Sequence, residues 1–248
     1  MKRREFLKLS ALAIGGIGIK LAEAIDFDRY DANEHYYVFV IDVRRCIGCG
    51  RCVRACKVEN EVPDGFYRTW VERYIWFEDG RLKVESPKGG FNGFPPLKDE
   101  RILKSYFVPK LCNHCENAPC VQVCPVGATF KTPDGVVLVD PKYCIGCGYC
   151  IQACPYGARY LYPEDGKDVL RRNTVDKCTF CYHRLKKGLK PACVEVCPTK
   201  ARMIFDLGNP DEKEEFLEIV SKNRVAVLKP EMNTKPKVFY IGIDNEVR

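Results

Sequence analysis

Four cysteines between residues 144 and 155 stand in a highly constraining spacing, C-x2-C-x2-C-x3-C-P. The run consists of Cys144, Cys147, Cys150, Cys154 and Pro155. Three thiolates separated by two residues on a tight loop can each bind one iron of a cubane cluster, whereas the fourth, turned away beside proline, serves a neighbouring cluster. Gly146 and Gly148 let the backbone approach inorganic sulfide and offer it N–H groups. The spacing therefore predicts iron–sulfur chemistry.

The pattern occurs three more times, so the run above is the third of four motifs. Motif one has the same gaps but Lys57 in place of the proline, whereas the middle gap is four residues in motif two and eleven in motif four. The other candidate ligands are Cys46, Cys49, Cys52 and Cys56 in motif one, Cys112, Cys115, Cys120 and Cys124 in motif two, and Cys178, Cys181, Cys193 and Cys197 in motif four. A shared Cys-Pro-x-x-Ala turn at 124–128, 154–158 and 197–201 indicates that the motifs are copies. All 16 cysteines are used, which is four times four and predicts four [4Fe-4S] clusters.

Size and charge fit buried clusters better than a nucleic-acid partner. The 248 residues could form one or two domains, with clusters replacing part of a hydrocarbon core. The formal net charge is +7, of which residues 1–24 contribute +3 through five basic and two acidic side chains. An oxidised cubane with four thiolates carries about −2, so four of them outweigh the remaining basic excess. The positive charge therefore compensates buried anions and does not indicate nucleic acid.

Residues 1–24 have the layout of a signal peptide. A charged start is followed by an apolar run, Leu9 to Leu21, and by Ala22-Glu23-Ala24, an A-x-A cleavage site. Arg3-Arg4-x-Phe6-Leu7-Lys8 resembles the twin-arginine (Tat) export motif, although Lys2 replaces the usual Ser or Thr. The alternative is an uncleaved anchor or an amphipathic helix.

Export also bears on the chemistry of the cysteines. Dense cysteine in an exported protein usually means disulfides. The Tat route carries folded proteins, so clusters assembled in the reducing cytoplasm can be exported intact. The mature chain is expected to begin near Ile25 and to lie in the periplasm or at the extracytoplasmic face of the cytoplasmic membrane.

The segments between the motifs predict an α+β fold. Strands are expected at 36–43, 68–77, 81–85, 106–108, 136–139 and 238–243, and helical segments at 52–59 and 210–223. Asp79-Gly80 is a hairpin turn, Asn209 a helix cap, and the final strand is expected to join one of the earlier ones. Motifs two and three are close enough in sequence to form one compact two-cluster module.

The insertion between motifs one and two is rich in aromatic residues. They are Phe66, Tyr67, Trp70, Tyr74 and Trp76. Such residues either pack over a cluster module or form a docking face, and packing is the more frequent outcome.

Five stretches resemble the iron–sulfur B subunits of the molybdopterin oxidoreductase (dimethyl sulfoxide reductase) family, especially those of tetrathionate and polysulfide reductases. They are 41–49 (IDVRRCIGC), 59–63 (ENEVP), 112–115 (CNHC), 177–181 (KCTFC) and 228–231 (LKPE). The resemblance covers nearly the whole chain after the leader. It implies two bacterial-ferredoxin-like 2[4Fe-4S] modules, with motif one pairing with motif four and motif two with motif three.

The resemblance also implies how ligands and segments are shared. Cluster 1 would take Cys46, Cys49, Cys52 and Cys197; cluster 2 Cys56, Cys178, Cys181 and Cys193; cluster 3 Cys112, Cys115, Cys120 and Cys154; and cluster 4 Cys124, Cys144, Cys147 and Cys150. The first module would comprise 25–60 and 170–205, the insertion 61–105, the second module 106–169 and a C-terminal extension 206–248.

By the same resemblance, the chain would be a non-catalytic electron-transfer subunit of an anaerobic respiratory complex. It would pass electrons between a molybdenum- or tungsten-containing pterin subunit, of the tetrathionate, polysulfide or thiosulfate reductase type, and an integral membrane quinone-reactive subunit. Consistent with this, the sequence contains no phosphate loop, dinucleotide fingerprint or hydrolytic nucleophile pattern.

Two other interpretations are open. The chain could be an exported polyferredoxin of another complex, such as a hydrogenase, a nitrite-reductase-linked system or a sulfur-metabolism membrane complex. A zinc-stapled interaction module is the less favoured alternative, because zinc sites use two well-separated cysteine pairs and lack four-cysteine runs that end in Cys-Pro.

Basic and imidazole side chains beside the motifs are candidates for adjusting cluster reduction potentials. They are His114, His183, Arg44 and Lys177. Hydrogen bonds to sulfur and nearby charge both change a cluster's potential. The alternative is that these side chains only pack or are solvated.

Overall fold

The structure is a computed structural model that describes residues 30–98 and 101–247. The expected signal peptide, residues 1–24, lies outside the described residues. The helices are α2 (Arg51–Glu59), α3 (Pro119–Gln122), α4 (Tyr149–Gln152), α5 (Tyr182–Leu185), α6 (Ala192–Glu195) and α7 (Pro210–Lys222). Single 3-10 turns lie at Ala32–Glu34, Val43–Arg45, Pro87–Gly90, Val169–Arg171 and Pro230–Met232.

The strands form four separate sheets. They are β1 (Tyr37–Asp42), β2 (Thr69–Phe77), β3 (Leu82–Glu85), β4 (Ile102–Leu111), β5 (Thr129–Lys131), β6 (Val137–Val139), β7 (Arg159–Leu161), β8 (Val175–Lys177), β9 (Arg202–Asp206), β10 (Val225–Ala226) and β11 (Val238–Ile241). This mixture of short helices and several sheets confirms the α+β expectation.

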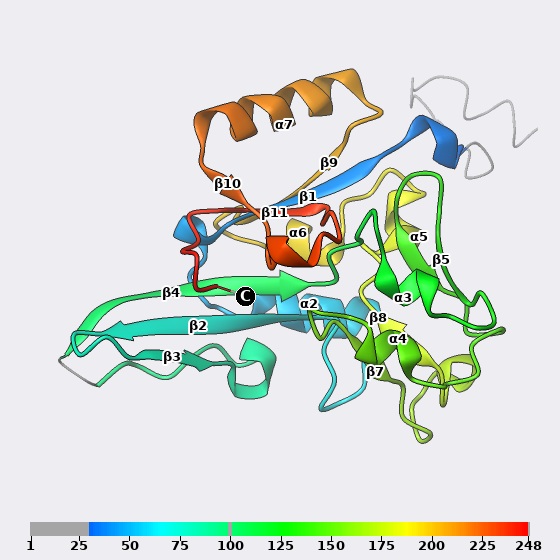
Figure 1. Cartoon of the computed structure of the whole chain (residues 1–248), viewed down its shortest axis with the longest axis horizontal. Helices are drawn as coiled ribbons and strands as arrows, with labels where there is room; N and C mark the ends of the chain where they lie inside the picture. Colours follow the sequence, from blue (N-terminus) through cyan, green and yellow to red (C-terminus); the bar gives the residue numbers. More distant parts are fainter. Residues whose placement is uncertain (1–29, 99–100, 248) are drawn as a thin grey trace, which may run out of the picture. The chain divides into compact units, whose positions relative to one another are not determined.

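The first sheet joins the beginning and the end of the described chain, in the order β10-β11-β1-β9. Strand β1 pairs in parallel with β11 and antiparallel with β9 (Figure 1). All six residues of β1 are buried, which explains why its sequence, YVFVID, is almost continuously apolar. The pairing of β1 with β11 confirms that the last strand joins an earlier one.

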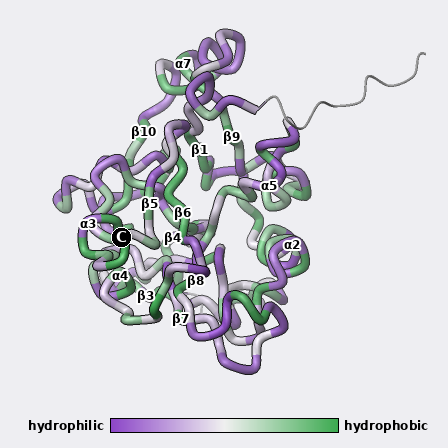
Figure 2. The backbone as a smooth tube through the Cα atoms, turned by 90° about the vertical axis from the view of Figure 1, so that its right-hand side faces the viewer, coloured by the Kyte–Doolittle hydropathy of each residue, from purple (hydrophilic) through white to green (hydrophobic). Residues whose placement is uncertain are grey.

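Helix α7 covers one face of this sheet. Its Phe216 ring packs against Phe205 of β9 and Phe239 of β11, with centroid distances of 5.9 and 5.5 Å. The Asn209 side chain accepts the Asp211 N–H, so the predicted cap is confirmed. Hydrophilic and hydrophobic residues alternate along the tube of α7, as expected of an amphipathic helix (Figure 2).

The insertion forms an antiparallel sheet in the order β3-β2-β4. Strand β4 begins earlier and ends later than the 106–108 predicted from its apolar centre, because its first half is half-buried or exposed and carries no apolar run. Trp76 and Tyr106 stack with their centroids 5.0 Å apart, and Phe66 stacks on Tyr160 at 4.9 Å. The insertion aromatics therefore mostly pack against neighbouring side chains.

Two small sheets follow the cysteine motifs. Strands β5 and β6 pair directly after motif two, and β7 pairs with β8 between motifs three and four. Strands β5, β7, β8, β9 and β10 were not predicted from the sequence, because each is only two to five residues long and lacks a sustained β-branched run. Such strands depend on tertiary pairing more than on their own sequence.

No helix in the described part of the chain is both long enough and apolar enough to cross a membrane.

Candidate iron–sulfur cluster sites

One cavity brings together three cysteines of motif one and one of motif four. Cys46, Cys49, Cys52 and Cys197 line it, with Arg202. Gly50 starts α2 in the left-handed region, with φ of 69°. A Cβ there would lie 2.2 Å from the Gly90 carbonyl oxygen, so only glycine lets the loop close here.

A second cavity has the reciprocal composition. Its cysteines are Cys56 of motif one and Cys178, Cys181 and Cys193 of motif four. Phe39 of β1 and Phe180 also line it, and their rings stack 5.5 Å apart. Phe39 belongs to the sheet β10-β11-β1-β9, called the central sheet below, which therefore contributes to one wall of this cavity. The cavity brings motifs one and four side by side although they lie far apart in the sequence.

Asn60 and Arg68 support the second cavity from behind. The Asn60 side-chain amide lies 3.6 Å from Cys56 Sγ and 3.7 Å from Cys181 Sγ, and donates to both. Arg68 Nη1 donates to Asn60 Oδ1 at 2.9 Å, and its guanidinium forms a bidentate pair with Asp176 at 2.9 and 2.7 Å. This chain of contacts fixes which way the amide points. The sequence analysis did not identify either residue.

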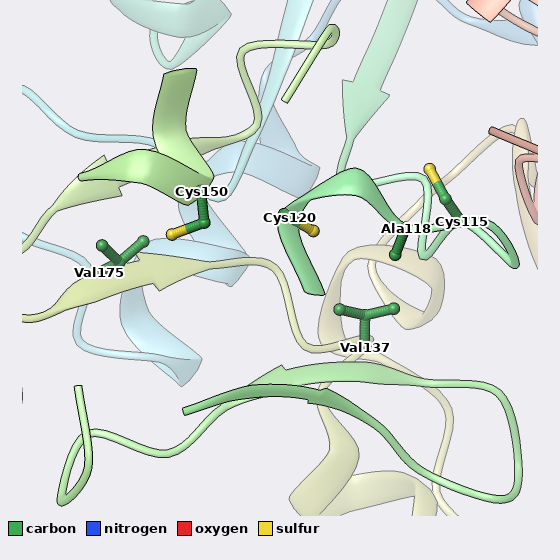
Figure 3. Close-up of a cluster of buried hydrophobic side chains, with 6 residues drawn as sticks. All are labelled: Cys115, Ala118, Cys120, Val137, Cys150 and Val175. Atoms are coloured by element: carbon green, nitrogen blue, oxygen red, sulfur yellow. The ribbon is translucent and has the colours of Figure 1, made fainter. Parts of the chain in front are cut away.

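Electrostatic interactions between thiols identify a third set of neighbouring cysteines, namely Cys112, Cys115, Cys120 and Cys154. Burial raises the pKa of the Cys115 thiol to about 12, and the neighbouring Cys112, Cys120 and Cys154 contribute to the same rise. Figure 3 shows Cys115 on the loop before helix α3, Cys120 on α3 and Cys150 on α4. Arg159 Nη2 donates to Cys120 Sγ at 2.9 Å.

The remaining cysteines, Cys124, Cys144, Cys147 and Cys150, lie next to the third set. Cys144 and Cys150 pack in the same apolar cluster as Cys120. Cys124 Sγ accepts the Thr129 N–H at 3.4 Å, and Cys144 Sγ accepts the Val175 N–H at 3.3 Å. The assignment of these four sulfurs to one cluster stays a prediction.

Cys147 is the one cysteine with an exposed side chain, and its surroundings are exposed and apolar. Tyr143, Ile145 and Tyr149 are 66, 64 and 58% exposed. The other fifteen cysteines are buried or half-buried, and all sixteen are free of disulfides. Across residues 30–98 and 101–247, no three His, Cys, Asp or Glu side chains converge as they would on a single metal ion.

Neighbouring sets influence one another. Burial raises the pKa of Cys178 in the second cavity, and Cys112 of the third set adds to the rise. Burial likewise raises the pKa of Cys193 to about 12, and Cys52 of the first cavity contributes. The first cavity is thus adjacent to the second cavity, and the second cavity is adjacent to the third set of cysteines.

Three buried cationic side chains lie among the cysteines, those of Lys177, Arg159 and Arg202. Lys177 is 1% exposed and its Nζ donates to the Cys178 carbonyl oxygen at 2.7 Å. Arg159 and Arg202 are 5 and 2% exposed. Thiolates are the species that bind iron, and burial opposes their formation, as the pKa of Cys46, raised to about 11 chiefly by burial, shows. Buried cations counteract that opposition.

Some buried polar side-chain atoms have no hydrogen-bond partner, and their positions show whether these sites suit iron–sulfur clusters. In the described part of the chain such side-chain atoms belong only to Asn113, His114 and Arg202. Asn113 and His114 stand between two ligand candidates, and Arg202 lines the first cavity. A buried donor without an acceptor is costly, and thiolate or sulfide sulfur would supply acceptors here. The sites therefore fit the clusters.

The candidate tuning residues differ in position. His114 is fully buried, accepts the Val137 N–H through Nδ1 at 3.0 Å and stacks on Phe180 at 3.7 Å. His183 and Arg44 have half-exposed side chains and bind carboxylates, Glu59 at 2.6 Å and Asp42 at 2.8 Å. Of these three residues, His114 has the position from which a cluster potential can be adjusted.

Comparison with known proteins agrees with this chemistry. Two family profiles, each described as a 4Fe-4S dicluster domain, match residues 103–207 and 45–128. The fold and the cysteine sets define an iron–sulfur protein built from two dicluster, ferredoxin-like domains, as predicted.

Several curated relatives are similar over most of their length. The tetrathionate reductase B subunit of Salmonella typhimurium is 42% identical over 248 residues, covering 98% of this chain and 89% of the relative. Its namesake from Archaeoglobus fulgidus is 45% identical over 85% of this chain and 84% of the relative. The thiosulfate reductase electron transfer subunit of Salmonella typhi is 43% identical over 72% of this chain and 78% of the relative. The chain belongs to the family of iron–sulfur B subunits of molybdopterin oxidoreductases, and is an electron-transfer subunit.

Replacing His114 tests its role in adjusting a cluster potential. His114→Ala removes a buried imidazole beside Cys112 and Cys115, and we expect one cluster's midpoint potential to shift without loss of iron. Redox titration followed by electron paramagnetic resonance (EPR) measures the shift. His183→Ala is the matched control, since that ring is half-exposed and binds Glu59. Titrations of His114→Ala that superimpose on the wild type would contradict the role.

Proposed function

We propose that this chain carries four [4Fe-4S] clusters and relays electrons between a molybdopterin-containing catalytic subunit and a membrane quinone-reactive subunit. The observation that carries the proposal is the reciprocal composition of the first two cavities, three cysteines of one motif with one of the other. Each bound cluster would accept and release one electron.

The proposed ligand sets are those that the resemblance implies. Cluster 1 is held by Cys46, Cys49, Cys52 and Cys197; cluster 2 by Cys56, Cys178, Cys181 and Cys193; cluster 3 by Cys112, Cys115, Cys120 and Cys154; and cluster 4 by Cys124, Cys144, Cys147 and Cys150. The adjacency of Cys52 to Cys193 and of Cys112 to Cys178 supports a relay in the order 1-2-3-4. The exposed position of Cys147 supports cluster 4 as one end of it.

The names of the relatives support a sulfur-compound reductase as the complex. Two of the relatives, 42 and 45% identical, come from tetrathionate reductases, and another comes from a thiosulfate reductase. We propose that the catalytic partner reduces a sulfur oxyanion or polysulfide.

A second candidate function is electron transfer in a complex that has a different catalytic subunit. It is favoured by similarity to an Hdr-like menaquinol oxidoreductase iron–sulfur subunit of Archaeoglobus fulgidus, 34% identical and covering 99% of this chain and all of the relative. The two candidates differ in what accompanies the chain in the cell.

Iron and acid-labile sulfide measurements on paired variants test the ligand sets. Cys46→Ala with Cys197→Ala removes two ligands of one proposed cluster, so about four irons per chain should be lost. Cys178→Ala with Cys197→Ala touches two clusters, so about eight should be lost. The reverse pattern, about eight irons lost from the first pair and about four from the second, would overturn the exchange of ligands between motifs one and four. Zinc in place of iron in the wild-type protein would support the zinc-stapled module instead.

Purification of the chain from native membranes tests its partners. We expect a larger subunit containing molybdenum or tungsten and an apolar membrane subunit to copurify, and metal analysis of the complex checks the first. Copurification with a catalytic subunit that lacks both metals would favour the second candidate.

The export route is proposed from residues 1–24 and tested there. Replacing Arg3 and Arg4 together by lysine keeps the charge and removes the twin arginines, so the protein should accumulate in the cytoplasm with its clusters bound. Cell fractionation and visible absorbance of each fraction measure this. Lys2→Arg is the matched control and should leave export unchanged. Export of the double-lysine variant at the wild-type level would contradict the Tat route.

A further inference from the structure

Two buried arginines occupy the same place in the sequence repeat. Arg159 and Arg202 each lie five residues after the last cysteine of a motif, directly after the alanine of the Cys-Pro-x-x-Ala turn. Each opens a strand, β7 or β9, and is almost fully buried. The equivalent residue after motif two is Thr129, and after motif one Glu61. Each proposed two-cluster module thus contains one such arginine.

Arg202 contacts the linings of both of the first two cavities. It lines the one that contains Cys46 and Cys52, and it donates to Thr69, which lines the other. Burial alone would lower the pKa of Arg202, but Cys52, then Cys193 and Cys46, raise it above the ordinary value, so its charge acts on cysteines of both cavities. Nη2 donates to Thr69 Oγ1 at 2.7 Å, whereas Nε and Nη1 have no partner.

Arg159 has the corresponding position in the other module. Nη2 donates to Cys120 Sγ at 2.9 Å, and Nη1 to a threonine hydroxyl, Thr129 Oγ1, at 3.3 Å. Burial alone would lower the pKa of Arg159. Four cysteines together raise it above the ordinary value, namely Cys120, Cys112, Cys150 and Cys154. Cys150 belongs to the fourth set and the other three cysteines to the third. Both arginines therefore bind a threonine and face cysteines of two sets.

Neither arginine is neutralised by a carboxylate. Within the described residues, no carboxylate pairs with Arg159 or Arg202, whereas the equally buried Arg68 and Arg73 pair with Asp176 and Glu85. A guanidinium keeps its charge in any protein, and an unpaired buried charge is strongly unfavourable. The counter-charge is available from the cysteines once they are thiolates, which bound iron keeps deprotonated, so that each loaded cubane site carries a net charge of about −2.

We infer that Arg159 and Arg202 are inter-cluster arginines, each placing one positive charge between the two clusters of its module and donating N–H groups to their sulfur atoms. This rests on the proposed function, because it requires two clusters per module. Reduction adds negative charge, so a cation between the clusters stabilises the reduced form of both and raises both potentials.

Redox titration of the full-length, cluster-loaded protein tests the inference. Arg202→Gln removes the charge but keeps an amide donor, and should lower the midpoint potentials of clusters 1 and 2 while leaving 3 and 4 unchanged. Arg159→Gln should do the reverse. We expect at least a tenfold change in the equilibrium constant for reduction, which is about 59 mV for a one-electron couple. EPR at each poised potential assigns the shifts.

Three control variants separate charge from packing. Arg202→Lys and Arg159→Lys retain the charge and should keep potentials closer to the wild type than the Gln variants do. Arg73→Gln removes an equally buried arginine whose charge Glu85 neutralises, and should shift no cluster. If a Gln variant loses iron while its Lys counterpart keeps it, the loss should fall on the two clusters of that module, which supports the inference.

The negative outcomes are distinct. Gln variants with full iron and four unchanged potentials would overturn the inference and leave the proposed function standing. Equal loss of iron from the Lys and Gln variants would also overturn it, since packing alone would then explain the arginines. A wild-type chain without cubane clusters would remove the proposed function itself.

Discussion

The structure depends on keeping negatively charged sulfur inside the protein. Most of the sixteen cysteines are buried or half-buried, and burial raises the pKa of several thiols, to about 11 for Cys46 and about 12 for Cys193. A chain that gathers thiolates in such surroundings needs bound iron and internal cations to offset the loss of hydration. Arg159, Lys177 and Arg202 supply the cations, and together with the cysteines they occupy space that aliphatic side chains fill in an ordinary core.

The rest of the fold holds the cysteine loops in place. The parallel pairing of β1 with β11 and the antiparallel pairing of β1 with β9 fix motif one beside motif four. The insertion contributes more than a surface hairpin, because Arg68, just before β2, binds Asp176 of β8 and orients Asn60 toward two sulfurs. Thr69, the first residue of β2, accepts from Arg202. One segment of the insertion thus supports the sites of motifs one and four.

The sequence predicted those features that are encoded locally. Cysteine spacing indicated the chemistry, and apolar runs or a cap indicated β1, β2, β11 and α7. Strands β7 and β9 could not be predicted this way, since each is short and is stabilised by a distant partner. The sharing of cysteines between motifs came from the resemblance, because spacing along the chain does not specify which loops meet. Asn60, Arg68 and the two inter-cluster arginines were missed. A comparison of the repeats one residue beyond the shared alanine would have identified the arginines.

The central sheet has a consequence for the order of synthesis. Strand β1 cannot pair with β11 until all the residues between them have left the ribosome, whereas motifs two and three are near neighbours in the sequence. Contacts between distant segments form late, because closing a long loop costs conformational entropy. The cysteines of motifs one and four therefore come together later than those of motifs two and three, and we expect the proposed sites that combine motifs one and four to be filled last.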